Sequence, residues 1–416
     1  MVRIAKTTTA MVLILSAAPV AAQSIDDRSA SDETLEGYRP VGARIGSFML
    51  HPSVDAFVEY DDNPLALPDA SSDDEILTVR GKVEARSLWR RHRLRGVAYV
   101  DQSLHRRWSS EDALEAGARV EGTFDISRDL SLRGYVAADA LSESRSSIGS
   151  IERSREPSRF SRKNTLVAVD WSLRPIEVTG EAEITELDFR DGVSFEGNPI
   201  EQDFRDSRYG RLSGRVAYEF APRLSALVRA QIDRFEYTSA EESGLQADRD
   251  STGYKLEAGG RIELTRLLFV EARAGILRRE SDSPAFADIS GVSYGGHVDW
   301  NVTPLTDVRF FFDREIEEGG SRLTTGNLRS QARLNVRHEL LRNFVIEADA
   351  RIARIRTLGA IDVAADEVAG ELSGIYYANR RLRIVGSLRY FDRSSDADFF
   401  RTFERKRAML GVRLAF

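Results

Sequence analysis

The sequence of 416 residues contains no cysteine, only five histidines, and no long hydrophobic run after its first 22 residues. Without cysteine, the chain has no disulfide framework, no thiolate nucleophile and no cysteine-ligated metal. Without an apolar run of about 20 residues, the mature chain has no predicted membrane-spanning helix. If such a chain sits in a membrane, it must cross as a β-barrel.

The first 22 residues have the pattern of an export signal. Arg3 and Lys6 precede the apolar run AMVLILSAAPV, and Val20 with Ala22 precedes a cleavage position at Gln23. We therefore expect residues 1–22 to be a signal peptide. The mature chain would carry 57 Lys and Arg residues against 66 Asp and Glu, and this net charge of −9 disfavours nucleic acid as a partner.

Apolar and polar residues alternate from about residue 48 onward. In FVIEADARI, Phe344 and Ile346 share one face, whereas Glu347 and Asp349 share the other. Charged residues at every second position would disrupt the core of a soluble sandwich, but they suit a wall between lipid and water. The pattern predicts an all-β fold, a transmembrane antiparallel β-barrel over residues 48–416. The polar residues 23–47 are expected to form a flexible periplasmic segment.

Short connectors alternate with longer polar stretches such as SESRSSIGSIERSREPS. The short connectors lie near residues 92, 127, 173, 221, 265, 303, 341 and 379. Tight turns at one rim and long loops at the other are typical of outer-membrane barrels, so the short turns predict the periplasmic rim. With one strand before the first hairpin and one after the last, we predict about 18 strands. One misjudged hairpin would change the count by two, so 16 to 20 strands are possible.

The chain ends on RKRAMLGVRLAF, in which Leu410, Val412 and Leu414 alternate with polar residues before a final Phe416. This strand must pair with the first one, because unpaired backbone groups in hydrocarbon are costly. A last strand ending on phenylalanine resembles the signal by which assembly machinery recognises outer-membrane proteins. The resemblance implies that machinery and outer-membrane lipid as partners, in the outer membrane of a Gram-negative bacterium.

The segment RIGSFMLHPSVDAFVEYDDNPL, residues 44–65, resembles the opening strand of the putative β-barrel porin 2 family of outer-membrane proteins. The residues that carry the resemblance are Gly46, Ser47, Phe48, Pro52, Ser53, Asp61, Asp62 and Asn63. Members of this family are associated with exopolysaccharide synthesis and export. The resemblance therefore implies exopolysaccharide and periplasmic export proteins as partners.

No constellation for catalysis is present. The five histidines lack the spacing of a metal site, and the mature chain contains no GxSxG motif and no P-loop. We predict no enzyme activity, no cofactor and no metal site. The histidines are His51, His92, His105, His297 and His338.

Charged residues on the inward parity are the candidate functional residues. The segment RSQARLNVR contributes three arginines without an acid, and IEVTGEAEITE contributes three glutamates. The lumen-lining candidates are Arg309, Arg329, Arg333, Arg337, Arg351, Glu177, Glu181 and Glu183. Two interpretations stay open: the charges brace and solvate the wall, or their segregation across the lumen creates a field that favours anions.

The sequence thus predicts a channel for hydrophilic material. Exopolysaccharide export is the cargo that the family resemblance favours, and a general or anion-preferring solute porin is the alternative. From another class, the chain could be a structural or adhesive surface barrel with a plugged lumen.

Overall fold

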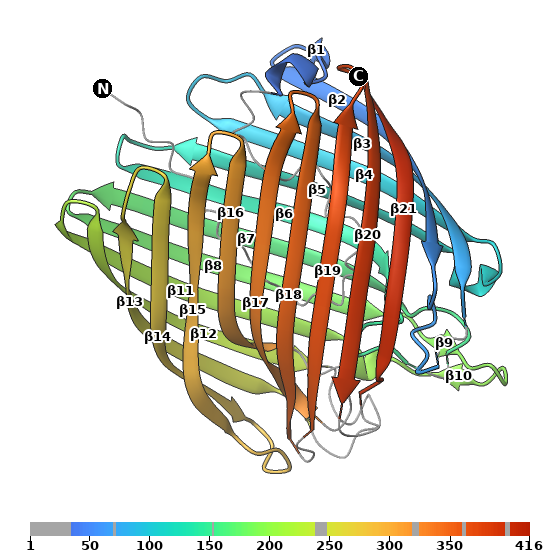
Figure 1. Ribbon diagram of the computed structural model, residues 1–416. Coiled ribbons are helices and arrows are strands. Elements are labelled where there is room, and N and C mark those ends of the chain that lie inside the picture. The colour runs from blue at the N-terminus through green and yellow to red at the C-terminus, as the bar shows by residue number, and fades with distance from the viewer. Residues whose placement is uncertain are drawn as a thin grey trace.

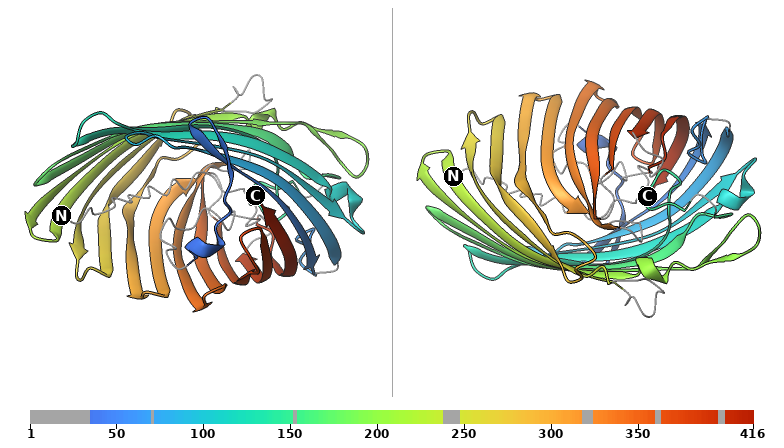
Figure 2. Two further views of the ribbon diagram at one scale, coloured as in Figure 1. Left: turned by 90° about the horizontal axis from the view of Figure 1, so that it is seen from above. Right: turned by 90° about the horizontal axis from the view of Figure 1, so that it is seen from below.

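The strands of the chain wrap around one lumen and close on themselves (Figures 1 and 2). The computed structural model describes residues 35–69, 72–151, 154–237, 248–317, 324–359, 363–395 and 400–416. Within these ranges, eighteen long antiparallel strands pair in chain order, and the last pairs with the first. The predicted fold class and strand number are confirmed. The predicted signal peptide, residues 1–22, and residues 23–34 lie outside the described residues.

The barrel strands are 12 to 18 residues long, more than the roughly 9 to 11 that cross the hydrocarbon of a bilayer. They are β2 (Phe48–Asp61), β3 (Asp74–Ser87), β4 (Arg93–His105), β5 (Ala113–Asp125), β6 (Leu130–Ser142), β7 (Arg159–Leu173), β8 (Ile176–Phe189), β11 (Ser207–Ala221), β12 (Leu224–Tyr237), β13 (Ser251–Glu263), β14 (Leu268–Ser281), β15 (Ile289–Thr303), β16 (Thr306–Glu317), β17 (Thr324–Leu341), β18 (Phe344–Gly359), β19 (Ala364–Tyr377), β20 (Leu382–Ser395) and β21 (Phe403–Ala415). Across the described ranges, no helix has the length and apolar character needed to span a membrane.

All eight predicted short turns join neighbouring strands at one rim, which is uppermost in Figure 1. They connect β3 to β4, β5 to β6, β7 to β8, β11 to β12, β13 to β14, β15 to β16, β17 to β18 and β19 to β20. The long loops leave the opposite rim and carry the small hairpin β9 (Gly192–Val193) and β10 (Pro199–Ile200). They also carry the single 3-10 turns η2 (Ser109–Glu111) and η3 (Asp203–Arg205).

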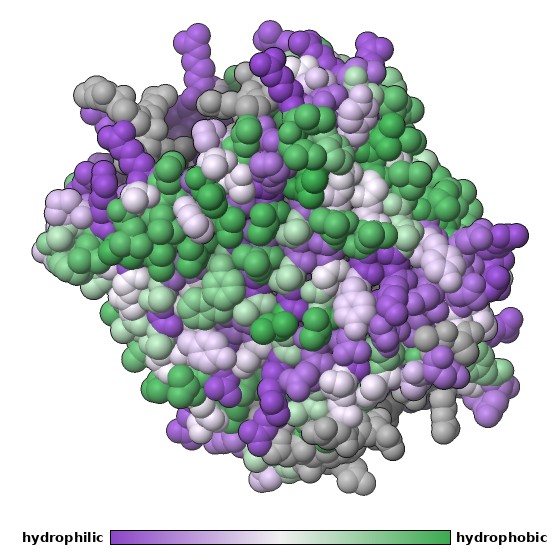
Figure 3. All heavy atoms as spheres, viewed as in Figure 1, coloured by the Kyte–Doolittle hydropathy of each residue, from purple (hydrophilic) through white to green (hydrophobic). Residues whose placement is uncertain are grey.

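The outer surface of the barrel is a broad apolar band, seen as green patches across the strands in Figure 3. On β21, Leu410 and Leu414 are exposed, whereas Arg413 between them is 2% exposed. This alternation turns every second residue toward lipid and the others toward the lumen. Exposed aromatic side chains lie near the short-turn rim; they are Trp171, Tyr218, Phe220, Trp300 and Phe416.

The first and last long strands close the barrel. β2 and β21 pair antiparallel from Ser53 opposite Ala415 to Asp61 opposite Arg407. The backbone N–H of Phe416 continues this ladder by donating a hydrogen bond to the carbonyl of Pro52 at 3.0 Å. The predicted pairing of the two end strands is confirmed, and neither long edge is left open.

Residues 35–47 differ from the flexible segment that the sequence predicts over 23–47. Leu35 is 3% exposed in a cluster with Val345, Ile375, Tyr377 and Val385. The single turn η1 (Glu36–Tyr38) and the short strand β1 (Ala43–Ile45) follow, and β1 pairs with the start of β2. An apolar side chain that fills a gap among inward residues at the periplasmic end fixes this part of the segment to the barrel.

Candidate functional site: the charged lumen and its inward loop

The lumen contains a cavity of about 680 Å³ whose wall is densely charged. Sixteen arginines and fourteen carboxylates line it among the described residues. The arginines are Arg80, Arg133, Arg145, Arg205, Arg211, Arg215, Arg229, Arg273, Arg329, Arg333, Arg351, Arg389, Arg393, Arg405, Arg407 and Arg413. The carboxylates are Glu59, Asp101, Glu111, Glu115, Glu143, Glu181, Glu271, Asp313, Glu315, Glu317, Glu347, Asp349, Glu367 and Glu371. The wall is therefore strongly hydrophilic and close to balanced in charge.

Neighbouring strands present opposite signs to the lumen. β16 contributes Glu315 and Glu317, and the adjacent β17 contributes Arg329 and Arg333. Arg329 bonds Glu317 at 2.8 Å and also reaches Glu367 of β19 at 2.9 Å. Because backbone pairing sets strands only about 5 Å apart, one arginine can join carboxylates on both sides of its own strand. Ion pairs between inward side chains recur on other strands of the wall.

Each arginine among the predicted lumen candidates has a carboxylate partner. Arg333 bonds Asp349 at 2.7 Å. The remaining pairs are looser: Arg337 with Glu347 at 3.6 Å, Arg351 with Glu367 at 3.6 Å, and Arg309 with Asp299 at 3.9 Å. Of the five arginines, Arg329, Arg333 and Arg351 line the cavity.

The three predicted glutamates on β8 are also paired. Glu177 accepts a hydrogen bond from Arg261 at 2.9 Å, Glu181 pairs with Arg133, and Glu183 pairs with Arg211. Glu181 alone of the three lines the cavity. Because both predicted groups are neutralised locally, the geometry favours the bracing interpretation of the inward charges over a field between two segregated walls.

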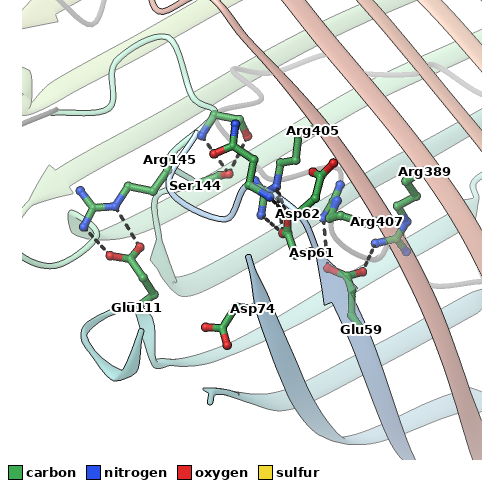
Figure 4. A network of polar contacts seen from close by, with 12 residues as sticks. Glu59, Asp61, Asp62, Asp74, Glu111, Ser144, Arg145, Arg389, Arg405 and Arg407 are labelled. Atoms are coloured by element: carbon green, nitrogen blue, oxygen red, sulfur yellow. Dashed lines mark hydrogen bonds and ion pairs between the residues drawn. The ribbon is translucent and has the colours of Figure 1, made fainter. Parts of the chain in front are cut away.

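The Asp-Asp-Asn ending of the first long strand ties it to the last. Asp61 is fully buried and pairs with Arg405 of β21 (Figure 4). Asp62 accepts a hydrogen bond from the backbone N–H of Lys406 at 2.6 Å. The side-chain amide of Asn63 donates to the carbonyl of Glu404 at 2.9 Å. These three residues therefore close the outer end of the β2–β21 seam, whereas Phe416 closes its periplasmic end.

The connection between β6 and β7 folds into the lumen instead of projecting outward. We call residues 143–158 the inward loop; it is described except for residues 152–153. Arg145 makes two hydrogen bonds to Glu111 of η2, at 2.6 and 2.9 Å (Figure 4). On another part of the wall, Arg393 of β20 donates to the carbonyl of Ser146 at 2.7 Å. The inward loop thus contacts both the β4–β5 loop and β20.

Apolar contact completes the attachment at the tip of the inward loop. Ile148 packs against a buried cluster formed by Ile355, Ala365 and Phe400. Residues 144–149 line the cavity together with the wall arginines. The inward loop therefore narrows the lumen near its outer mouth.

A second loop holds the base of the inward loop. Glu143 and Arg205 of η3 are both about 2% exposed and form two hydrogen bonds, at 2.7 and 2.9 Å. The Arg205 guanidinium also lies 3.9 Å above the ring of Phe189. A buried pair of this kind is costly to break from one side, because the remaining charge stays buried without a partner.

The sequence does not reveal the inward loop. Its serine-rich stretch resembles any solvated outer loop, and only Ile148 and Ile151, the two large apolar residues of the stretch, hint at an attachment point. The partners Glu111, Arg205 and Arg393 come from three other parts of the chain, so no local pattern contains them. Within the described ranges, no group of three or more His, Asp or Glu side chains is placed to hold a metal ion.

A family model supports the barrel assignment. The model of the family described as putative beta-barrel porin 2 matches residues 36–416. No curated protein matches the chain. Among solved structures, the copper transporter OprC is similar over 90% of this chain and 81% of its own, at 10% identity and a TM-score of 0.49. A mutant ferric enterobactin receptor, PfeA of Pseudomonas aeruginosa, is similar over 91% and 81%, at 6% identity and a TM-score of 0.48.

Proposed function

Because the chain belongs to the putative β-barrel porin 2 family, we propose that it is an outer-membrane channel for hydrophilic material. The observation that carries this proposal is the cavity of about 680 Å³ inside a closed barrel, lined by thirty charged side chains. Such a wall replaces the hydration of polar solutes and offers little to apolar ones. The proposed role is transport and not catalysis.

Exopolysaccharide leaving the cell is the proposed cargo. Support comes from the first long strand, whose Gly46 to Asn63 pattern resembles family members associated with exopolysaccharide export. Periplasmic export proteins would meet the barrel at its short-turn rim, where residues 35–47 pack. A flexible hydroxyl-rich chain suits a wall of paired charges, because hydroxyl groups both donate to carboxylates and accept from guanidinium groups.

Two alternative functions each have one structural observation in their favour. The slight excess of arginines over carboxylates around the cavity favours a solute porin with a weak anion preference. The inward loop, held by buried ion pairs at Glu143 and Arg145, favours a barrel that is closed at rest and serves the cell surface through its loops.

Single-channel conductance of the refolded protein in a planar bilayer tests the proposal. We expect steady openings, a reversal potential that shows weak anion preference in a salt gradient, and block when an acidic polysaccharide is added. Arg351→Gln should shift selectivity toward cations, because it leaves Glu367 with less compensation. Arg354→Gln is the matched control, since Arg354 lies on the same strand but is exposed and pairs with Asp366.

Each outcome has a distinct meaning. Block by polysaccharide supports export, whereas openings without polymer block favour the solute porin. A barrel that never conducts would contradict the channel proposal and favour the surface role.

A further inference from the structure

Three rings form a row on the inner wall of the barrel. Phe269 of β14 stacks on His297 of β15 with ring centroids 5.3 Å apart and planes inclined by 24°. His297 in turn stacks on Phe311 of β16 at 6.2 Å and 27°. The three residues occupy inward positions of consecutive strands, and His297 and Phe311 line the cavity. We call this set the ring row.

Packing within an apolar core does not account for the ring row. All three side chains are half-buried, and none belongs to the four buried apolar clusters of the described residues. Their cross-strand neighbours are charged: Glu271 lies opposite His297, and Arg333 lies opposite Phe311. The apolar ring surface that stays in contact with water on this charged wall gains free energy when a ligand covers it.

The neighbourhood supplies polar groups at the edges of the rings. Asp299 lies opposite Phe269 in the register and pairs loosely with Arg309 at 3.9 Å. On the other side of the row, Arg333 bonds Asp349 at 2.7 Å. Flat apolar faces flanked by a few oriented donors and acceptors are the usual composition of a site for an amphipathic small molecule. A pyranose ring has this amphipathic character, with C–H bonds on its faces and hydroxyl groups at its edge.

We propose that the ring row binds the hexopyranose units of a saccharide chain inside the lumen; this inference rests on the proposed channel function. The sugar face lies against Phe311 and His297, and its hydroxyl groups exchange hydrogen bonds with Arg333, Asp349 and Asp299. Phe269 extends the row to the second residue of β14, at the short-turn rim. A saccharide that enters from the periplasm therefore meets the ring row before it reaches the inward loop.

Equilibrium binding to the full-length barrel, refolded in detergent micelles, tests this site without requiring ion flow. The probes are maltohexaose, which is neutral, and an oligomannuronate of six units, which is acidic. Polyethylene glycol of similar size controls for simple inclusion in the lumen. We expect the parent protein to bind a saccharide, and Phe311→Leu to weaken that binding roughly fivefold, about 1 kcal/mol. Phe310→Leu is the matched control, because the Phe310 side chain lies on the outward parity of the same strand and is 36% exposed.

The outcomes separate this proposal from the channel function. Equal affinity of Phe311→Leu and the parent, or no saccharide binding by a parent protein that conducts ions, overturns the ring row and leaves the channel proposal in place. Saccharide binding by a barrel that never conducts supports the ring row and contradicts the open channel. If Phe311→Leu fails to refold, as judged by heat-modifiable gel mobility, His297→Leu takes its place with the same expected weakening.

Discussion

At the scale of single residues, Asp206 is an acid placed among other acids. Burial raises the pKa of its carboxyl to about 6, and Asp188, Asp203 and Asp191 add to this increase, although the Phe189 N–H donates a hydrogen bond to it. The folded pKa therefore exceeds the unfolded value of about 4. Between these values the folded state binds more protons, so its stability decreases as the pH rises from about 4 to 6.

We predict that local opening around η3 follows this pH dependence. Hydrogen exchange of residues 202–207, corrected for the intrinsic exchange rate, should show less protection at pH 7 than at pH 4. Asp206→Asn should abolish this pH dependence, because the amide does not titrate. Asp282→Asn, in a different outer loop, is the control and should keep it. An unchanged pH dependence in Asp206→Asn would show that another group is responsible.

The sequence indicates which side chains face the lumen, but it does not indicate which ion-pair partners these side chains have. Arg329, Arg333 and Arg351, which the period-two alternation predicts to face inward, line the cavity. Their carboxylates depend on strand register and barrel curvature: Arg329 reaches Glu367 two strands away, and the run RSQARLNVR gives no sign of that contact. The three β8 glutamates, which one of the two interpretations sets against these arginines across the lumen, pair with arginines of nearby strands.

At the scale of elements, the inward loop is held mainly by two buried ion pairs, Glu143 with Arg205 and Arg145 with Glu111. We predict that Glu143→Gln combined with Arg145→Gln releases the loop from the lumen and increases single-channel conductance. Removing one partner of a buried pair costs roughly 3 to 5 kcal/mol, enough to change the preferred position of a loop. Arg106→Gln is the control, because Arg106 pairs with Glu75 at the same rim but both are exposed.

The loop prediction has a clear contrary result. If the double variant keeps the heat-modifiable mobility of a folded barrel and its conductance equals that of Arg106→Gln, the inward loop does not limit passage.

The strands and short turns were largely predictable from the sequence, because turn chemistry and alternation are local signals. The position of the inward loop was not, because it depends on contacts with η2, η3 and β20.

At the scale of the whole molecule, Phe416 combines a small structural role with a proposed assembly role. It is 52% exposed, and its backbone contributes one hydrogen bond to Pro52. We predict that Phe416→Ala decreases the amount of barrel assembled in the outer membrane of a Gram-negative host severalfold. Refolding of the purified chain into detergent should be unchanged. Phe220→Ala, which removes another exposed aromatic at the same rim, is the control for loss of membrane contact.

The assembly prediction depends on the contrast between assembly in the bacterial outer membrane and refolding in detergent. Equal assembly of Phe416→Ala and Phe220→Ala in the host would contradict a recognition role for the last residue. A refolding defect in detergent would instead assign Phe416 to barrel stability.

Among the described residues that line the cavity, the basic side chains of the Lys and Arg type are all arginines, and none is a lysine. Guanidinium groups stay protonated at any pH that a folded protein tolerates, whereas carboxylates do not. Acid therefore changes the lumen in one direction only: each carboxylate that takes up a proton leaves a guanidinium without its counter-charge. Acid can therefore add net positive charge to the lumen wall, whereas mild alkali cannot add net negative charge by deprotonating its guanidinium groups.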